Sequence, residues 1–316
     1  MPAVGVDIGG TKVLAVRLGP KGPEAECRVP TPLDRPGIVD AVTEVVDAVA
    51  SAPDSVGVGL PGMVDAAGVL RSSAHLAGIA GLRLADALQE RWPTAPVWVG
   101  NDATAAGWAE HTVGAGRGRG DLLMVTLGTG IGGGIVTGGR LVGGAHGYAG
   151  EWGHMVVDPH GPPCPCGQRG CWERFASGSG LGRLGRDEAM AGRAPRLVEL
   201  AGGDAEAVRG EHVTAAAREG DEAARSIMAD LAWWLALGLA NLANALDPEV
   251  IVLGGGLVDA GELLLAPARR AFAGLVEGGP LREVEILAAT LGPLAGAVGA
   301  GLLAGSSPAA GSYAVP

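Results

Sequence analysis

The sequence predicts an α/β protein with two lobes. At 316 residues the chain is long for one hydrophobic core. A pattern of apolar strand, glycine turn and second apolar strand occurs twice, near residues 4–18 and 122–136. Segments with apolar residues at helical spacing follow these strands. We therefore expect one α/β lobe in each half of the chain.

Composition limits the function classes. The chain is 47% apolar and 18% charged, as in a soluble globular protein. Its net charge of -11 argues against nucleic-acid binding, which needs clustered cations. The longest apolar run, residues 231–240, is too short to cross a bilayer and predicts a buried core helix. No targeting or membrane segment is recognisable, so we expect a cytoplasmic protein without a membrane partner.

Further elements follow in chain order from periodicity and turn residues. Strands are expected at 56–60, 97–99, 122–127 and 249–253. Helices are expected at 37–51, 82–91, 103–110 and 221–246, from about residue 259, and at 292–303. Trp233 and Trp234 are expected in the core, the glycine-arginine segment 114–120 is the predicted crossing between lobes, and residues 306–316 are expected to be disordered.

The first glycine turn comprises Gly9, Gly10, Thr11 and Lys12, with Asp7 at its mouth. Glycines permit positive φ and let backbone N–H groups approach an anion, while Thr11 adds a hydroxyl donor. A plain hairpin would show the same pattern. The turn at residues 61–65, which includes Gly62, would likewise present backbone to a ligand.

The second glycine turn, residues 128–134, reads Gly-Thr-Gly-Ile-Gly-Gly-Gly. Two similar turns, one per lobe, suggest that a nucleotide's phosphates are held between them. Residues 128–133 also match the dinucleotide fingerprint G-x-G-x-x-G, but that fingerprint requires a helix to begin there, and a strand and turn follow instead. The chain contains no G-K-[ST] tripeptide, which excludes a P-loop. The turn at 254–256 suits a nucleotide's sugar or base.

Asp102 follows directly after the strand at 97–99, with Asn101 before it. Ligands of open α/β sheets bind outside the carboxyl ends of the strands, so Asp102 is a candidate site residue. The alternative is that Asp102 serves only as the N-cap of the next helix.

A metal site is predicted from His154, Cys164, Cys166 and Cys171. Four thiolate or imidazole ligands close a tetrahedron around structural Zn²⁺, and the intervening glycines and prolines let a short loop wrap the ion. A Cys-x-Cys disulfide would be strained. The closed set leaves no position for water, so the ion would fix shape.

Two carboxylates, Glu151 and Glu173, end the stretch that contains these ligands. Either could be an ordinary surface group. With a metal between them, the two are expected to converge. Cys27 has no evident partner and is expected to be a buried thiol.

Taken together, these residues resemble the ROK family of sugar kinases and repressors, in the actin-like and hexokinase-like ATPase superfamily. The matching segments are Asp7 to Thr11, Asn101 and Asp102, Gly128 to Gly134, Glu151 to His154, Cys164 to Glu173, and Gly254 to Gly256. They occur in the family's order and cover the chain almost end to end. The cysteine-glycine run is highly specific, whereas glycine turns alone are not.

The resemblance implies two ribonuclease H-like lobes, at residues 1–116 and 117–291, with a final helix at 292–305 packing back on the first. It implies transfer of a phosphoryl group from ATP with Mg²⁺ to the 6-hydroxyl of a hexose, with glucose as the first candidate and Asp102 as the base. The family is often dimeric or tetrameric, so a homo-oligomer is expected. Family repressors carry an N-terminal helix-turn-helix, for which the first strand at Val4 leaves no room.

The resemblance also implies the roles of individual residues. The sugar-binding set is Gly62, Asn101, Asp102, Glu151, His154 and Glu173. The nucleotide and Mg²⁺ set is Asp7, Gly9, Gly10, Thr11, Lys12, Gly128, Thr129, Gly130, Gly132, Gly254, Gly255 and Gly256. Fructose, mannose, allose or an N-acetylhexosamine as substrate, polyphosphate as donor, and a non-catalytic sugar sensor remain as alternatives.

Overall fold

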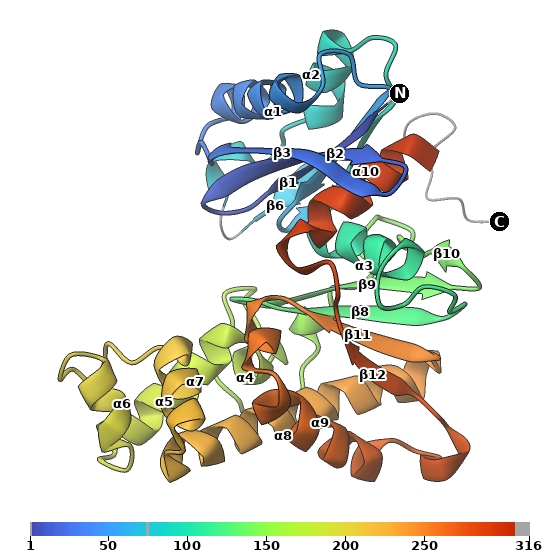
Figure 1. The fold of residues 1–316 in the computed structure, drawn as a ribbon. Helices are drawn as coiled ribbons and strands as arrows, with labels where there is room; N and C mark the ends of the chain where they lie inside the picture. Colours follow the sequence, from blue (N-terminus) through green and yellow to red (C-terminus); the bar gives the residue numbers. More distant parts are fainter. Residues whose placement is uncertain (1, 74–75, 307–316) are drawn as a thin grey trace. The chain divides into compact units, whose positions relative to one another are not determined.

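The chain forms two compact units in a computed structural model that describes residues 2–73 and 76–306 (Figure 1). Unit 1 contains residues up to 124, residues 133–150 and residues from 289 onward, and unit 2 contains residues 125–132 and 151–288. This division by packing places residues 117–124 and 133–150 in unit 1, whereas the sequence analysis put them in the second lobe. The lobes as domains stay a prediction, and the expected disorder at 306–316 falls almost wholly outside the described residues.

The sheet of unit 1 has the order β3-β2-β1-β4-β7. Strands β1 and β2 are antiparallel, and β1, β4 and β7 run parallel to one another. The bounds are β1 Ala3–Ile8, β2 Lys12–Gly19, β3 Gly22–Pro30, β4 Ser55–Leu60 and β7 Val97–Asn101, with a small ribbon of β5 Met63–Val64 and β6 Leu70–Ser72. Because the three parallel strands end at one edge, the residues after them are brought together there.

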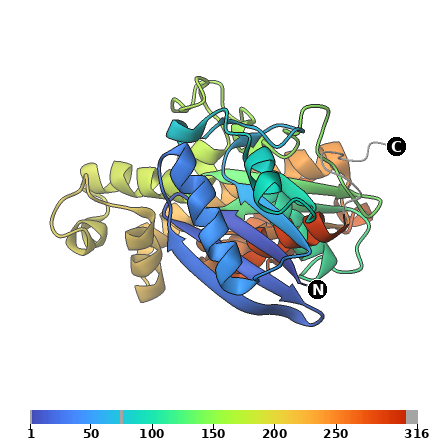
Figure 2. The same cartoon turned by 90° about the horizontal axis from the view of Figure 1, so that it is seen from above.

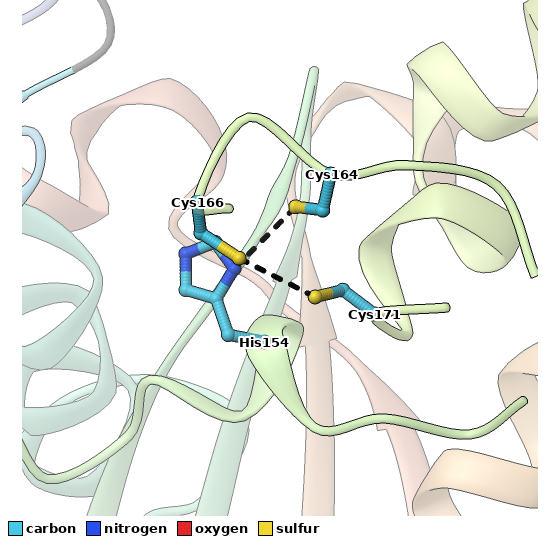
Figure 3. A group of neighbouring side chains, drawn as sticks. All are labelled: His154, Cys164, Cys166 and Cys171. Carbon is cyan, nitrogen blue, oxygen red and sulfur yellow. Dashed lines mark hydrogen bonds between the residues drawn. The ribbon is translucent and has the colours of Figure 1, made fainter. Parts of the chain in front are cut away.

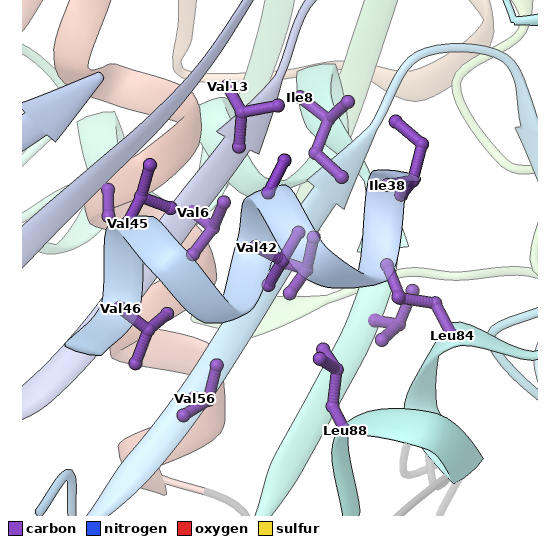
Figure 4. Packing of buried hydrophobic residues seen from close by; sticks show 14 of the residues in the cluster. Val6, Ile8, Val13, Ile38, Val42, Val45, Val46, Val56, Leu84 and Leu88 are labelled. Atoms are coloured by element: carbon purple, nitrogen blue, oxygen red, sulfur yellow. The ribbon is translucent and has the colours of Figure 1, made fainter. Parts of the chain in front are cut away.

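One face of this sheet is covered by helix α1 (Arg35–Val49), which lies across the strands in Figure 2, and by α2 (Leu84–Arg91). The Asp34 side chain caps α1 by accepting a hydrogen bond from the Gly37 N–H at 2.9 Å. Figure 4 shows the core under α1, where valines and isoleucines of the strands meet its apolar stripe. The stripe predicted from the sequence is confirmed, since Ile38, Val42, Val45, Val46 and Val49 are all buried.

The other face carries helices α3 (Asp102–Thr112) and α10 (Ala295–Ser306). Helix α10 packs against β1, β4 and α3. Glycines make this close approach possible: a Cβ at Gly5 would collide with the carbonyl of Ala297, and one at Gly57 with that of Ala300. Small residues therefore let helix backbone lie directly on the sheet.

The second sheet has the order β10-β9-β8-β11-β12. Its bounds are β8 Leu122–Leu127, β9 Ile131–Thr137, β10 Arg140–Leu141, β11 Val250–Gly254 and β12 Glu285–Ala288. The helices of unit 2 are α4 Glu173–Ala176, α5 Gly178–Met190, α6 Pro195–Leu200, α7 Gly210–Glu219, α8 Glu222–Leu246 and α9 Glu262–Leu275. Helices α4 to α7, between residues 173 and 219, are not predicted from the sequence.

Helix α8 is long and apolar enough to span a membrane by length and composition, but 61% of its apolar window is buried inside the structure. That burial agrees with the core helix predicted from the sequence. The prediction for Trp233 was wrong, because its side chain is 44% exposed, and Trp234 is only half-buried. At 100° per residue, the face containing Leu231, Leu235 and Leu239 points inward and Trp233 lies away from it.

Candidate active site

The carboxyl ends of the parallel strands of unit 1 bring Asp7 and Asp102 to one edge. Asp7 pairs in register with Gly59 of β4, and Gly59 pairs with Gly100 of β7. A Cβ at Gly59 would lie only 3.2 Å from the Cα of Asp102. Gly59 therefore leaves the space that lets the two acidic residues approach each other across the edge.

Asp7 is half-buried near the end of β1. Burial raises the pKa of its carboxyl group from 3.8 to about 6, although the cation of Lys12 acts to lower it. A Cβ at Gly296, at the start of α10, would lie 3.1 Å from a carboxylate oxygen of Asp7. The carboxylate is thus enclosed by the helix as well as by the sheet, and a cation bound there would stabilise its charged form.

Asn101 is the N-cap of α3, and Asp102 is the first residue of the helix. The alternative that Asp102 acts only as the cap is therefore excluded. The Asn101 side chain accepts a hydrogen bond from the Thr104 N–H at 2.8 Å and donates one to the Gly62 carbonyl at 3.1 Å. Gly62 has a φ of 114°, a conformation that favours glycine. Asn101 thus fixes both the start of α3 and the turn at Gly62.

The first glycine turn connects β1 to β2 and is closed by a hydrogen bond from the Gly9 N–H to the Lys12 carbonyl at 2.9 Å. The Thr31 hydroxyl donates to the Gly9 carbonyl at 2.7 Å, and the Thr31 N–H donates to the Thr11 carbonyl at 3.2 Å. Gly10 and Thr11 are exposed. The turn is therefore anchored from behind by the end of β3, while its tip remains open.

In unit 2, His154, Cys164, Cys166 and Cys171 converge as predicted (Figure 3). Their four ligand atoms lie within 4.8 Å of one another, with the sulfurs of Cys166 and Cys171 3.5 Å apart. In a tetrahedral zinc site with Zn–S bonds of about 2.3 Å, the ligand atoms are roughly 3.8 Å apart. The cluster therefore fits a closed four-coordinate ion, and all four cysteines of the chain are free thiols.

The thiols differ in acidity. Burial raises the pKa of Cys164 to about 12 and also raises that of Cys171, whereas a hydrogen bond from the backbone N–H of Gln168 lowers the pKa of Cys166. Metal binding requires thiolates, and a bound cation supplies the charge that buried thiolates need. The nitrogen of His154 that faces Cys164 is Nδ1, 3.9 Å from the sulfur. This leaves Nε2 for another partner.

Glu173 connects the cysteine cluster to the second glycine turn. Its Oε1 lies 3.4 Å from the Cys164 sulfur, and a Cβ at Gly130 would lie 2.7 Å from its Oε2. Burial raises the pKa of Glu151. The charge of His154 acts to lower this pKa, and the Glu173 carboxylate acts to raise it further. Glu151 therefore lies close enough to His154 and Glu173 for their charges to act on it, and the convergence of the two glutamates stays a prediction.

The second glycine turn is fastened by the start of α5. The Gly178 N–H donates to the Gly128 carbonyl at 2.8 Å, and the Ser179 hydroxyl donates to the Thr129 carbonyl. Strand β9 begins at Ile131, so no helix starts at these glycines and the requirement of a dinucleotide fingerprint is not met. The glycine turn at residues 254–256 lies next to the one at residues 128–134. A Cβ at Gly255, which has a φ of 86°, would lie 2.5 Å from the Leu127 carbonyl oxygen.

A cavity of about 710 Å³ opens beside these two turns, wholly within unit 2. Its wall includes Gly128, Thr129 and Gly256, which the sequence analysis had singled out. It also includes residues that the sequence analysis missed: Ser179, Arg186, Arg209, Thr214, Arg218 and Asp259. Most of these belong to α5 and α7, and the available signal was the helix start at Ser177, whose side chain accepts from the Gly180 N–H at 3.1 Å.

Comparison with known proteins agrees with this architecture. The model of the ROK family matches residues 3–307. A glucokinase of Streptomyces coelicolor is 40% identical over 310 residues, covering 95% of this chain and 96% of the relative. An N-acetylmannosamine kinase of Escherichia coli is 33% identical over 314 residues, which cover 96% of this chain and 98% of the relative. A crystal structure of a ROK family glucokinase from Streptomyces griseus, in complex with glucose and AMPPNP, is 39% identical with a TM-score of 0.85, covering 97% of this chain and 100% of that one.

Fold, cluster and strand-edge carboxylates thus define a kinase-like ATPase of the hexokinase type. The chain belongs to the ROK family. Since its curated relatives at 33–40% identity are kinases that act on sugars, the chain is an enzyme of the sugar-kinase class.

Proposed function

We propose that the protein is an ATP-dependent glucokinase that transfers the γ-phosphoryl group to the 6-hydroxyl of glucose. The observation that carries the proposal is Glu173, which lies between the cysteine cluster and Gly130 of a glycine turn. A carboxylate suited to sugar hydroxyls thereby stands next to a turn suited to phosphates. Relatives at 34–40% identity named glucokinase support glucose over other hexoses.

Asp102 is the proposed general base. Its carboxylate accepts the proton of the 6-hydroxyl while the hydroxyl oxygen bonds to the γ-phosphorus and the bond from phosphorus to the bridging oxygen of ADP breaks. Asp102 is half-buried at the first position of α3, and the Ala103 N–H donates to its Oδ1 at 2.8 Å. That hydrogen bond orients the carboxylate.

Sugar hydroxyls are assigned to Asn101, Glu151, His154 and Glu173, with the Gly62 backbone as a further contact. Carboxylate and imidazole groups at fixed angles select a particular arrangement of hydroxyls. His154 would present Nε2 to the sugar, because Nδ1 faces the thiol cluster. The four ligands would hold one structural Zn²⁺, which keeps the loop in shape and takes no part in the transfer.

The nucleotide is assigned to the cavity of unit 2 and to both glycine turns. The cavity is large enough for an adenosine group, and arginines in its wall suit a polyanion. Backbone N–H groups at Gly9 to Thr11 and at Gly128 to Gly130 would contact phosphates. Asp7 would bind Mg²⁺, directly or through water, and Mg²⁺ when bound neutralises charge on the phosphates.

The proposal is tested by ADP release with Mg-ATP over a panel of hexoses and hexosamines. We expect fast turnover on glucose and a kcat at least about 10²-fold lower for Asp102→Ala, with an unchanged circular dichroism spectrum. Near-normal turnover in Asp102→Ala would remove that residue from the mechanism. Turnover on another sugar alone would change the substrate, and sugar binding without turnover would indicate a sensor.

A further inference from the structure

Among the residues that the structure describes, Glu110 is the one charged side chain that is fully buried, with 0% exposed. It lies in the last turn of α3, at the opposite end of the helix from Asp102. Burying a carboxylate is costly unless several hydrogen bonds compensate for lost water. The hydrogen-bond partners of Glu110 therefore show which parts of the structure the buried carboxylate holds together.

The partners are all donors from outside the helix. Oε1 accepts from the N–H groups of Thr290 and Leu291 at 3.0 and 2.8 Å. Oε2 accepts from the Ala115 N–H at 2.8 Å and from the Thr290 hydroxyl at 3.3 Å. A carboxylate only accepts, so it satisfies this set, whereas an amide would direct one of its own N–H groups at a donor.

One segment that Glu110 holds follows the last residue of unit 2, and the other leads to β8, the strand in which unit 2 begins. Thr290 and Leu291 come just after residue 288, where the chain returns to unit 1, and Ala115 begins the loop that leads to β8. After Leu291 the chain enters α10, and a Cβ at Gly299 of α10 would collide with the Ala105 carbonyl of α3. Glu110 thus ties the returning chain to the two helices that contact the acidic edge.

We propose that Glu110 is a positioning residue for the phosphoryl transfer, an inference that rests on the proposed function. It clamps the returning segment to α3, so that Asp102 at the far end of α3 and Asp7 beside α10 keep their places when substrates bind. Glu110 is fully buried, so it offers no surface for a substrate to contact. Its loss should therefore reduce kcat and leave nucleotide binding in the cavity of unit 2 intact.

The test compares Glu110→Gln with Glu44→Gln, the same change at an exposed position of α1. Hydrogen exchange of peptides covering residues 289–294 should be faster in Glu110→Gln and unchanged in Glu44→Gln. We expect kcat to fall about tenfold through misplacement of the base, while the Kd of ATP measured without sugar and without Mg²⁺ stays within about twofold of wild type.

A milder pair keeps the test decisive if Glu110→Gln does not fold. Thr290→Val removes the hydroxyl that donates to Oε2, and Thr290→Ser retains it. We expect lower kcat and faster exchange in Thr290→Val, both restored in Thr290→Ser. Faster exchange with normal kcat would show a purely structural clamp and overturn the proposal, as would an equal loss of ATP affinity. An inactive wild-type enzyme would instead refute the proposed function, which the same assay reveals.

Discussion

The two glycine turns look alike in sequence and differ in what holds them. The turn at Gly9 to Thr11 is anchored by Thr31, the residue that follows β3, through hydrogen bonds to the carbonyls of Gly9 and Thr11. The turn at Gly128 to Gly130 is anchored by the start of α5, which follows the cysteine cluster closely along the chain. One turn is therefore fixed by sheet structure, and the other by a segment that follows the proposed metal ligands.

The carboxylates beside the two turns differ in the same way. Asp7 is placed by the register of β1 with β4 and is enclosed by α10. Glu173 is positioned by the cluster, through Cys164, and by Ser177, whose hydroxyl donates to the Glu173 carbonyl at 2.6 Å. Metal loss should consequently disturb the site in unit 2 and leave the acidic edge of unit 1 in place.

The largest effect is expected from Cys166→Ser. Wild-type protein should contain one tightly bound zinc per chain, and the variant should lose it together with measurable glucose binding, because Glu173 and His154 lose their support. Plasma mass spectrometry and calorimetry measure the two quantities. Cys27→Ser, which changes a thiol in β3 outside the ligand group, is the matched control and should keep both. If pure wild-type protein contains no zinc, the proposal that a metal supports the site in unit 2 is wrong.

An intermediate effect is expected from Asp7→Asn, measured as stability against pH without ligands. The pKa of about 6 for Asp7 in the folded protein exceeds the ordinary aspartate value of 3.8, so the native state holds the proton more tightly than the unfolded state. Stability from this group is present below about pH 4 and is lost as the pH rises through 6, which amounts to about 3 kcal/mol.

Asp7→Asn should therefore be more stable than wild type to urea at pH 7.5 and nearly equal to it at pH 4. The same substitution should impair Mg-ATP turnover, since the amide is a poor ligand for a hard cation. Equal stability of the two proteins at both pH values would mean that Asp7 is not strained by burial.

The smallest effects are expected from the turn anchors. Ser179→Ala removes the hydroxyl that donates to the Thr129 carbonyl, and Thr31→Val removes the one that donates to the Gly9 carbonyl. Loss of one such hydrogen bond should raise the KM for ATP about threefold to tenfold. The change in Ser179→Ala should be larger, because Ser179 also lines the cavity. Steady-state kinetics show which variant has the larger rise in the KM for ATP. A larger rise in Thr31→Val would mean that the turn at Gly9 to Thr11 contributes more to ATP binding than the turn at Gly128 to Gly130.

Local patterns were enough to predict much of the site. The spacing of His154, Cys164, Cys166 and Cys171 predicted the metal ligands. Residues so close in the chain, with glycines that allow tight turns between them, are brought together within one short loop. The alternation in β1 and the stripe of α1 predicted their buried faces, since burial follows periodicity. Edge strand β3 and the helices α5–α7 were missed, because glycine, proline and charged residues outnumber the few apolar positions that face the core in these segments.

The sequence by itself determined the family, the glycine turns, the ligand set and the acidic residue after β7, since each depends on residues close together in the chain. Only the tertiary structure decided that Glu173 adjoins Gly130 and that Glu110 holds Thr290 and Leu291. The physical reason is sequence distance. Partners separated by 40 to 180 residues leave no local periodicity, and their pairing is fixed by strand order and helix packing.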